Sequence, residues 1–127
     1  MGSGIANPLQ DLLHDRWAGD DFFARRASGA DPVLVTGDFN AGETNPAFQQ
    51  LLEAPEVALF DTFRSLHPAA REVGTFNGFE GTTRGEKIDA VLASEAWKIL
   101  AAEIVRAARQ GRYPSDHFPV TATLTLR

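Results

Sequence analysis

The chain has 127 residues, of which 43% are hydrophobic, and this is enough for one ordinary globular domain. Its 12 basic and 17 acidic side chains give a net charge of −5, which argues against tight, sequence-independent attraction to nucleic acid but leaves weak or local phosphate binding open. The lack of cysteine excludes disulfides and thiolate catalysis. No apolar run approaches membrane-spanning length and no signal peptide is recognisable, so we expect a soluble chain without a membrane span and favour the cytoplasm as its compartment.

The first thirty residues predict a short tail followed by one helix. Residues 1–4 have the composition of a flexible or cloning-derived start, and residues 5–127 are expected to form a single domain. Between residues 7 and 27, apolar side chains recur at a spacing that predicts one face of a helix, which Gly29 would end. His14 on this helix has no polar partner at a suggestive spacing and is interpreted as a surface residue.

An apolar, β-branched run at residues 32–36 predicts a short strand. The run lacks the alternation of a half-exposed strand, so we expect both of its faces to be covered. Asp38 and Asn40 follow directly, at the kind of strand end where ligand-binding polar groups collect in α/β proteins. The alternative is a simple Gly-Asp-Phe-Asn turn, which these residue types also form readily.

The middle of the chain predicts a helix, a short connecting element and a glycine-rich loop. Asn45 and Pro46 form a good helix start, and residues 57–66 read as a short extended piece or a helical turn. Residues 74–85 are rich in glycine but match neither a Walker A motif nor a dinucleotide-binding fingerprint. The aromatic and amide side chains of this loop form either the wall of a binding pocket or the packed centre of the loop itself; they are Phe76, Asn77 and Phe79.

Two further segments are candidates for strands. Residues 87–92 carry Asp89 in an otherwise apolar run, and a carboxylate there needs a partner to offset its desolvation. His117 is the obvious candidate for that partner. Residues 94–110 have the composition of a helix, but their apolar side chains also alternate as in a strand, so the residues alone leave both structures open.

The last polar cluster lies near the carboxyl end. Asp116 and His117 stand side by side, and residues 120–126 alternate apolar and hydroxyl side chains, as a strand with one buried face does. Such a strand would hold both groups rigidly at the mouth of a sheet, which suits metal binding, proton transfer or contact with an anion. Taken alone, Ser-Asp-His also fits a turn before an edge strand.

Three polar motifs therefore follow one another along the chain: Gly-Asp-Phe-Asn at 37–40, Ile-Asp-Ala-Val-Leu at 88–92 and Ser-Asp-His at 115–117. With Gly-Thr-Phe-Asn-Gly-Phe at 74–79 and Arg-Tyr-Pro at 112–114, their order and spacing resemble the carboxyl-terminal half of the endonuclease/exonuclease/phosphatase superfamily, the DNase I-like metal-dependent phosphoesterases. The resemblance covers residues 32–126. It implies an α/β (α+β) fold, half of a four-layer α/β sandwich, with a mainly antiparallel or mixed sheet and flanking helices. It also implies a strand at residues 97–105.

The resemblance further implies a role for each polar residue. Asp38 would orient or deprotonate the attacking water, and Asn40 would hold that water or a phosphate oxygen. His117 would contact the phosphoryl oxygens while Asp89 fixes its tautomer. The cofactor would be Mg²⁺ or Mn²⁺, which prefer oxygen ligands. By role, the implied residues are Asp38, Asn40, Asp89 and His117 for catalysis, Asn40, Asn77, Arg84 and His117 for substrate binding, and Asp116 and Asp38 for the metal. For Asn77 and Arg84, a purely structural role in the loop is the alternative.

The chain departs from the family pattern before Asp38. In the family, an amino-terminal half supplies an Asn, the main Glu metal ligand and a Tyr or His near the phosphate, and these motifs are not found here. The resemblance thus implies a truncated, divalent-metal-dependent phosphoesterase that hydrolyses a phosphodiester or phosphomonoester in a nucleic acid or a small phosphorylated molecule. The alternative is a catalytically incomplete half-domain that acts only as a self-associating module. An exposed sheet face would then be covered by the missing half or by a second copy in a twofold homodimer.

Overall fold

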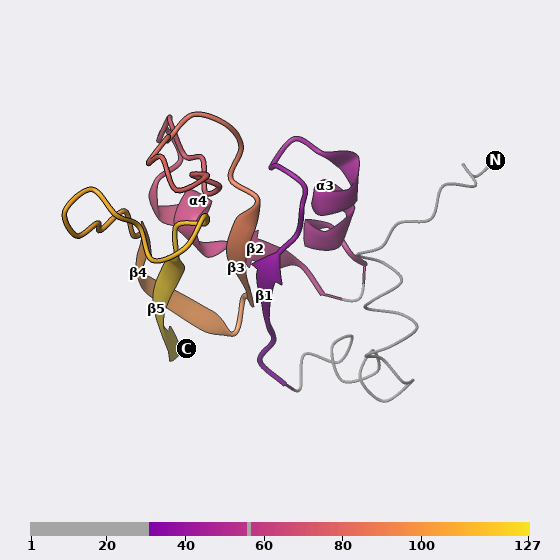
Figure 1. Cartoon of the computed structure of the whole chain (residues 1–127). Coiled ribbons are helices and arrows are strands. Elements are labelled where there is room, and N and C mark those ends of the chain that lie inside the picture. The colour runs from indigo at the N-terminus through magenta and orange to yellow at the C-terminus, as the bar shows by residue number, and fades with distance from the viewer. Residues whose placement is uncertain (1–30, 56) are drawn as a thin grey trace.

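The computed structural model describes residues 31–55 and 57–127, and the tail and helix predicted within residues 1–30 lie outside this part. In chain order its elements are β1 (Leu34–Asp38), α3 (Pro46–Leu52), β2 (Leu59–Asp61), α4 (Thr62–Leu66), β3 (Asp89–Ser94), β4 (Trp97–Ile104) and β5 (Val120–Leu126). The combination of helices with antiparallel strands confirms the predicted fold class (Figure 1). No helix in this part of the chain is long and apolar enough to cross a membrane.

The strands β1, β3 and β2 form a three-stranded antiparallel sheet with β3 in the middle. β1 pairs with β3 along its whole length, from Leu34 opposite Ala93 to Asp38 opposite Asp89. This register brings the carboxyl end of β1 beside the amino end of β3. Two aspartates that lie far apart in the sequence are therefore cross-strand neighbours.

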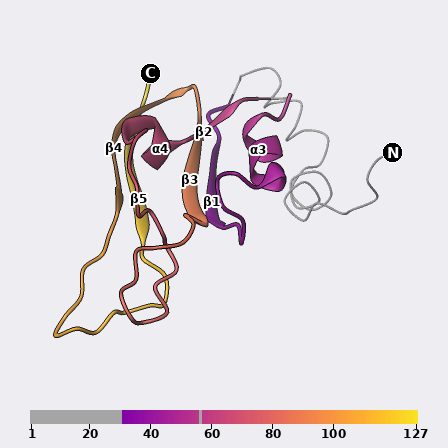
Figure 2. The same cartoon turned by 90° about the horizontal axis from the view of Figure 1, so that it is seen from above.

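The strands β4 and β5 form a second, two-stranded antiparallel sheet. β4 follows β3 after a tight turn at Glu95 and Ala96, and its register with β5 shifts between Ile99 and Ala101. The strand implied at residues 97–105 is confirmed, because pairing with β5 overrides the helix propensity of this alanine-rich stretch. The loop that precedes β3 and the loop between β4 and β5 extend from the same end of the strands (Figure 2).

The helix α3 starts where the sequence predicts it. The Asn45 side chain caps the helix by accepting a hydrogen bond from the Ala47 N–H at 2.8 Å, and Pro46 occupies the first turn. α3 lies on the side of β1 that faces away from β4 and β5 (Figure 2). Its buried side chains join one cluster with residues of the sheet, made of Val33, Ala41, Phe48, Leu51, Leu59, Ala90 and Leu92.

The stretch at residues 57–66 contains both of the structures that the sequence left open. The three-residue strand β2 runs directly into α4, and Asp61 stands at the boundary. Asp61 Oδ1 accepts hydrogen bonds from the N–H groups of Phe63 at 3.1 Å and Arg64 at 3.3 Å, which caps the helix. α4 packs against β3 and β4 and so links the two sheets.

The expectation that the first strand is covered on both faces is wrong. Four of the five residues of β1 are exposed, and Leu34 keeps 44% of its surface accessible. Among the described residues β1 pairs with β3 alone, so it forms an edge of the sheet. Val35 of β1, together with Val33 just before it, packs with the core, while the opposite face, which carries Leu34 and Thr36, is exposed in the described part of the chain.

Candidate active site

Two carboxylates meet at the junction of β1 and β3. Asp38 ends β1, Asp89 begins β3, and the two are directly opposite in the antiparallel register. Side chains at opposed positions lie on the same face of a sheet, so these two project together. Like charges in this arrangement repel, and the pair needs a positive group nearby to be stable.

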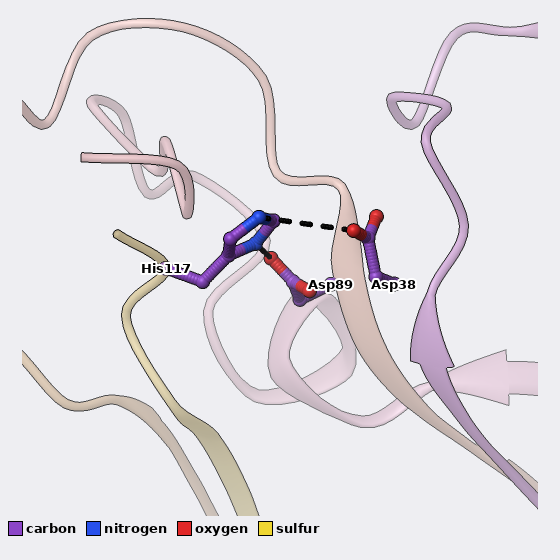
Figure 3. Close-up of side chains that lie close together, drawn as sticks. All are labelled: Asp38, Asp89 and His117. Atoms are coloured by element: carbon purple, nitrogen blue, oxygen red, sulfur yellow. Dashed lines mark hydrogen bonds and ion pairs between the residues drawn. The ribbon is translucent and has the colours of Figure 1, made fainter. Parts of the chain in front are cut away.

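His117 supplies that group from the turn that precedes β5. Its ring Nδ1 lies 2.8 Å from Asp89 Oδ2, and its Nε2 lies 3.7 Å from Asp38 Oδ2 (Figure 3). Because the carboxylate only accepts, Nδ1 carries the proton in the contact with Asp89. The backbone N–H of His117 also donates to Ser115 Oγ at 3.1 Å, which fixes the turn. One ligand atom from each of Asp38, Asp89 and His117 can be chosen so that all lie within 4.8 Å of one another.

The electrostatics of the cluster favour a protonated imidazole. The hydrogen bond from His117 to Asp89 raises the pKa of His117, and the charges of Asp89, Asp38 and Asp116 act in the same direction against partial desolvation. The ring is therefore suited to donate from Nε2 toward an anion.

We expect the Asp89→Asn substitution to lower the pKa of His117 in the metal-free protein. The amide keeps the shape of the carboxylate but removes the charge and the strongest acceptor, so the pKa should move toward the ordinary value of about 6.5. Titration of the His117 ring protons by NMR measures the change directly. An unchanged pKa would show that Asp89 does not set it.

The same shift fixes the direction of the pH dependence of folding. Because the folded pKa of His117 is raised, its protonated form stabilises the native state. This stabilisation is complete below the unfolded pKa of about 6.5 and disappears as the pH rises through the folded pKa. Urea unfolding at one pH below this window and one pH above it gives the free energy of unfolding at both. On going to the higher pH, this free energy should fall more for the wild type than for Asp89→Asn.

The Gly-Asp-Phe-Asn motif holds the Asp38 carboxylate in a defined orientation. The N–H of Asn40 donates to Asp38 Oδ1 at 2.9 Å, and Asn40 adopts a left-handed backbone with φ of 50°. This is the local turn that an Asp two residues ahead of an amide readily forms, and asparagine tolerates the conformation well. Asn40 itself is exposed beside the carboxylate, in a position where it can meet a ligand.

Three other predicted residues lie outside the Asp38, Asp89 and His117 cluster. Asn77 is only 1% exposed, and its side chain is used within the loops: Nδ2 donates to the Ser115 carbonyl at 3.3 Å and Oδ1 accepts from the Phe79 N–H at 2.7 Å. Asp116 accepts from the Asn77 N–H through its carbonyl at 2.6 Å, and its side chain is not part of the cluster. Arg84 is exposed on the glycine-rich loop.

A shallow pocket of about 310 Å³ lies beside the cluster and spans both sheets. Two residues of the glycine-rich loop lie close to this region. Phe76, for which the sequence left a pocket wall and the packed centre of the loop open, sets its ring edge-on to the His117 ring at a centroid distance of 5.4 Å. Thr75 was not singled out from the sequence, although its place next to Phe76 and Asn77 was the available signal; its hydroxyl accepts from the Ile88 N–H and its carbonyl from the Phe118 N–H. The pocket is lined by Thr36, Gly37, Asp38, Asp89, Ala90, Val91, Ser115, His117, Phe118, Pro119 and Val120.

The donor set fits a hard divalent cation held at the Asp38 side of the cluster. The Asp38 side chain is 39% exposed and offers Oδ2, whereas Asp89 Oδ2 and His117 Nδ1 already bind each other. Carboxylate oxygens with room for several waters are the ligands that Mg²⁺ and Mn²⁺ prefer.

The arrangement is that of an acid–histidine centre at the strand ends of an α/β sandwich fragment. The chain belongs to the endonuclease/exonuclease/phosphatase family, whose model matches residues 2–117. No curated protein matches it.

Three solved structures are similar to the chain. A functionally unknown conserved protein from Enterococcus faecalis V583 is 25% identical with a TM-score of 0.65, over 94% of this chain and 42% of that one. The mannosyl-6-phosphatase Bt3783 of Bacteroides thetaiotaomicron VPI-5482 is 26% identical with a TM-score of 0.59, over 75% of this chain and 38% of that one. An endonuclease/exonuclease/phosphatase family protein from Bacteroides thetaiotaomicron is 24% identical with a TM-score of 0.64, over 82% of this chain and 41% of that one. This third likeness supports the fold alone. The chain thus spans about two fifths of the length of these structures.

Proposed function

We propose that the chain carries the histidine-containing part of a divalent-metal-dependent phosphoesterase. The observation that supports this most directly is the convergence of Asp38, Asp89 and His117 from three separate segments in a member of this family. A phosphate ester presents negative oxygens around a poor electrophile, so its hydrolysis depends on positioning and on neutralising charge. A protonated imidazole flanked by an oriented carboxylate offers both.

Each residue of the cluster has a distinct part in this proposal. His117 donates from Nε2 to a phosphoryl oxygen, and its charge opposes the negative charge that builds up during the reaction. Asp89 keeps the Nδ1 proton in place and orients the ring. Asp38, held through Oδ1 by the Asn40 N–H, orients the attacking water through Oδ2 or accepts its proton.

The proposed cofactor is Mg²⁺ or Mn²⁺. When bound, such an ion would polarise the phosphoryl group and lower the pKa of a coordinated water. Asp38 is the residue of the cluster best placed to hold it, through an exposed oxygen, and Asp116 could contribute through water from the adjacent turn.

A small phosphorylated molecule is the substrate class that we favour. One of the similar structures is named a mannosyl-6-phosphatase, a name that indicates a sugar phosphate as its substrate. The net charge of −5 also opposes strong attraction to a long nucleic acid. A phosphomonoester of a sugar is accordingly preferred to duplex DNA.

We expect turnover of p-nitrophenyl phosphate to require Mg²⁺ or Mn²⁺ and to stop when EDTA removes the ion. The monoester should be hydrolysed faster than bis-p-nitrophenyl phosphate if the substrate is a small phosphomonoester, and more slowly if it is a diester. Asp38→Asn should lower kcat by about 10²-fold or more, since the amide cannot accept a proton. Full turnover in EDTA would contradict metal dependence.

A second candidate function is self-association without catalysis. It is favoured by large apolar side chains exposed on strands of both sheets, Leu34, Phe60, Leu100 and Leu126. Absence of any metal-dependent turnover, together with a dimer at micromolar concentration in sedimentation experiments, would favour this candidate over the first.

A further inference from the structure

Thr75 joins the two segments that carry Asp89 and His117. It is fully buried, and its hydroxyl oxygen accepts hydrogen bonds from the backbone N–H groups of Ile88 at 2.9 Å and Asp89 at 3.2 Å. Its carbonyl oxygen accepts from the N–H of Phe118 at 2.7 Å. A single residue therefore holds the backbone of Asp89 on one side and the residue after His117 on the other.

The same contacts extend to the segment that carries Asp38. Ile88, whose N–H is bound by the Thr75 hydroxyl, accepts a hydrogen bond from the Phe39 N–H through its carbonyl at 2.8 Å. The Thr75 N–H donates in turn to the Glu86 carbonyl at 3.3 Å. Thr75 therefore bonds to Asp89 directly and to Phe118, the residue after His117. It reaches Phe39, the residue after Asp38, through Ile88.

We propose that Thr75 is a positioning residue for the Asp89–His117 pair, an inference that rests on the phosphoesterase function proposed above. Its hydroxyl is the acceptor for two partly buried backbone N–H groups at and just before the start of β3, and without it both would lose this partner. The start of β3 would shift to find other partners. A displacement of about 1 Å in a catalytic group can cost about 10²-fold in rate.

Two substitutions separate positioning from packing at this site. Thr75→Val keeps the volume and removes the acceptor, whereas Thr75→Ser keeps the acceptor and removes a buried methyl group. We expect Thr75→Val to lower kcat by about tenfold to hundredfold with little change in KM, because a misaligned His117 loses mainly the stabilisation of the charge that builds up in the transition state. Thr75→Ser should keep kcat within about twofold of the wild type, although it loses stability through the missing methyl group.

The tautomer of His117 provides a second measurement that does not depend on turnover. At a pH where the ring is neutral, ¹⁵N NMR should show the Nδ1–H form in the wild type and in Thr75→Ser, since Nδ1 donates to Asp89. Thr75→Val should show a mixture that includes the Nε2–H form. A wild type without phosphoesterase activity would refute the proposed function and still leave this measurement available.

The combined results decide the assignment. A Thr75→Val protein with wild-type kcat and tautomer would overturn it. So would a Thr75→Ser protein that loses the Nδ1–H form or loses kcat as severely as Thr75→Val, because packing would then explain both. If Thr75→Val does not fold, Thr75→Ser alone decides: retention of the wild-type tautomer and kcat at reduced stability supports positioning, and their loss refutes it.

Discussion

Replacing His117 with alanine is expected to lower kcat by about 10²-fold to 10⁴-fold, the range found when a positioned proton donor or charge-stabilising donor is removed. The imidazole lies between Asp89 and Asp38, which raise its pKa, with Nε2 directed toward the exposed carboxylate of Asp38 and Nδ1 fixed by that of Asp89. Without it, no side chain of the Asp38, Asp89 and His117 cluster opposes the negative charge of the two carboxylates or of the phosphate. The measurement is steady-state hydrolysis of p-nitrophenyl phosphate with saturating metal ion.

The matched control is His67→Ala, which removes the same side chain at a distant position. His67 follows α4, and its Nε2 lies 2.8 Å from the Ala102 carbonyl, so it serves the packing of α4 against β4. This variant should keep kcat within about twofold of the wild type even if it is less stable. Comparable losses in both variants, or full activity in His117→Ala, would contradict the role assigned to His117.

Local patterns were sufficient to predict the elements that bring the site together. Asn45 and Pro46 set the start of α3 by capping chemistry that acts within a few residues. The position of Asp38 just after an apolar run and of Asp89 at the start of another predicted two carboxylates at strand ends. Their meeting depends on the antiparallel register of β1 with β3, which the residues alone did not specify; the family resemblance implied a mainly antiparallel or mixed sheet and a shared site, but no register.

The predictions that failed or stayed coarse concern contacts between distant residues. An apolar strand composition predicts that β1 is covered on both faces, but cover depends on which elements pack on each face of the sheet, and in the described part of the chain the face of Leu34 stays exposed. For Asn77 the sequence left substrate contact and a structural role in the loop open, and in the structure its amide bonds with Ser115 and Phe79. Asp116 adjoins His117 in sequence, and its backbone carbonyl accepts a hydrogen bond from the Asn77 N–H, while the metal-binding role of its carboxylate stays a prediction.

Lys87 is a residue whose burial depends on a contact with a residue distant in the sequence, so its local sequence alone predicts the wrong environment for it. In the sequence it is a charged residue at the start of a strand, which usually lies in solvent. In the structure its side chain is completely buried, and Nζ makes an ion pair with Asp61 Oδ2, whose side chain is 5% exposed. The ammonium also lies 5.8 Å from the centre of the Phe48 ring. Asp61 caps α4 with its other oxygen, so this one pair connects β2, α4 and the residues leading into β3.

We therefore expect Lys87→Met to destabilise the protein by about 3–5 kcal/mol, because it leaves the Asp61 carboxylate buried without its partner. Methionine keeps most of the volume, so the loss reports on charge rather than on a cavity. Urea unfolding followed by circular dichroism measures the change, and Lys98→Met, which alters an exposed lysine on β4, should stay within about 0.5 kcal/mol of the wild type.

The double variant Asp61→Asn with Lys87→Met tests the electrostatic origin of this loss. Asparagine still caps α4 but carries no charge, so the double variant should recover a large part of the stability that Lys87→Met loses. A double-mutant cycle over the four proteins gives the coupling energy of the pair. If Lys87→Met costs no more than Lys98→Met, or if adding Asp61→Asn lowers stability further by its full separate cost, the buried pair is not what joins α4 to the start of β3.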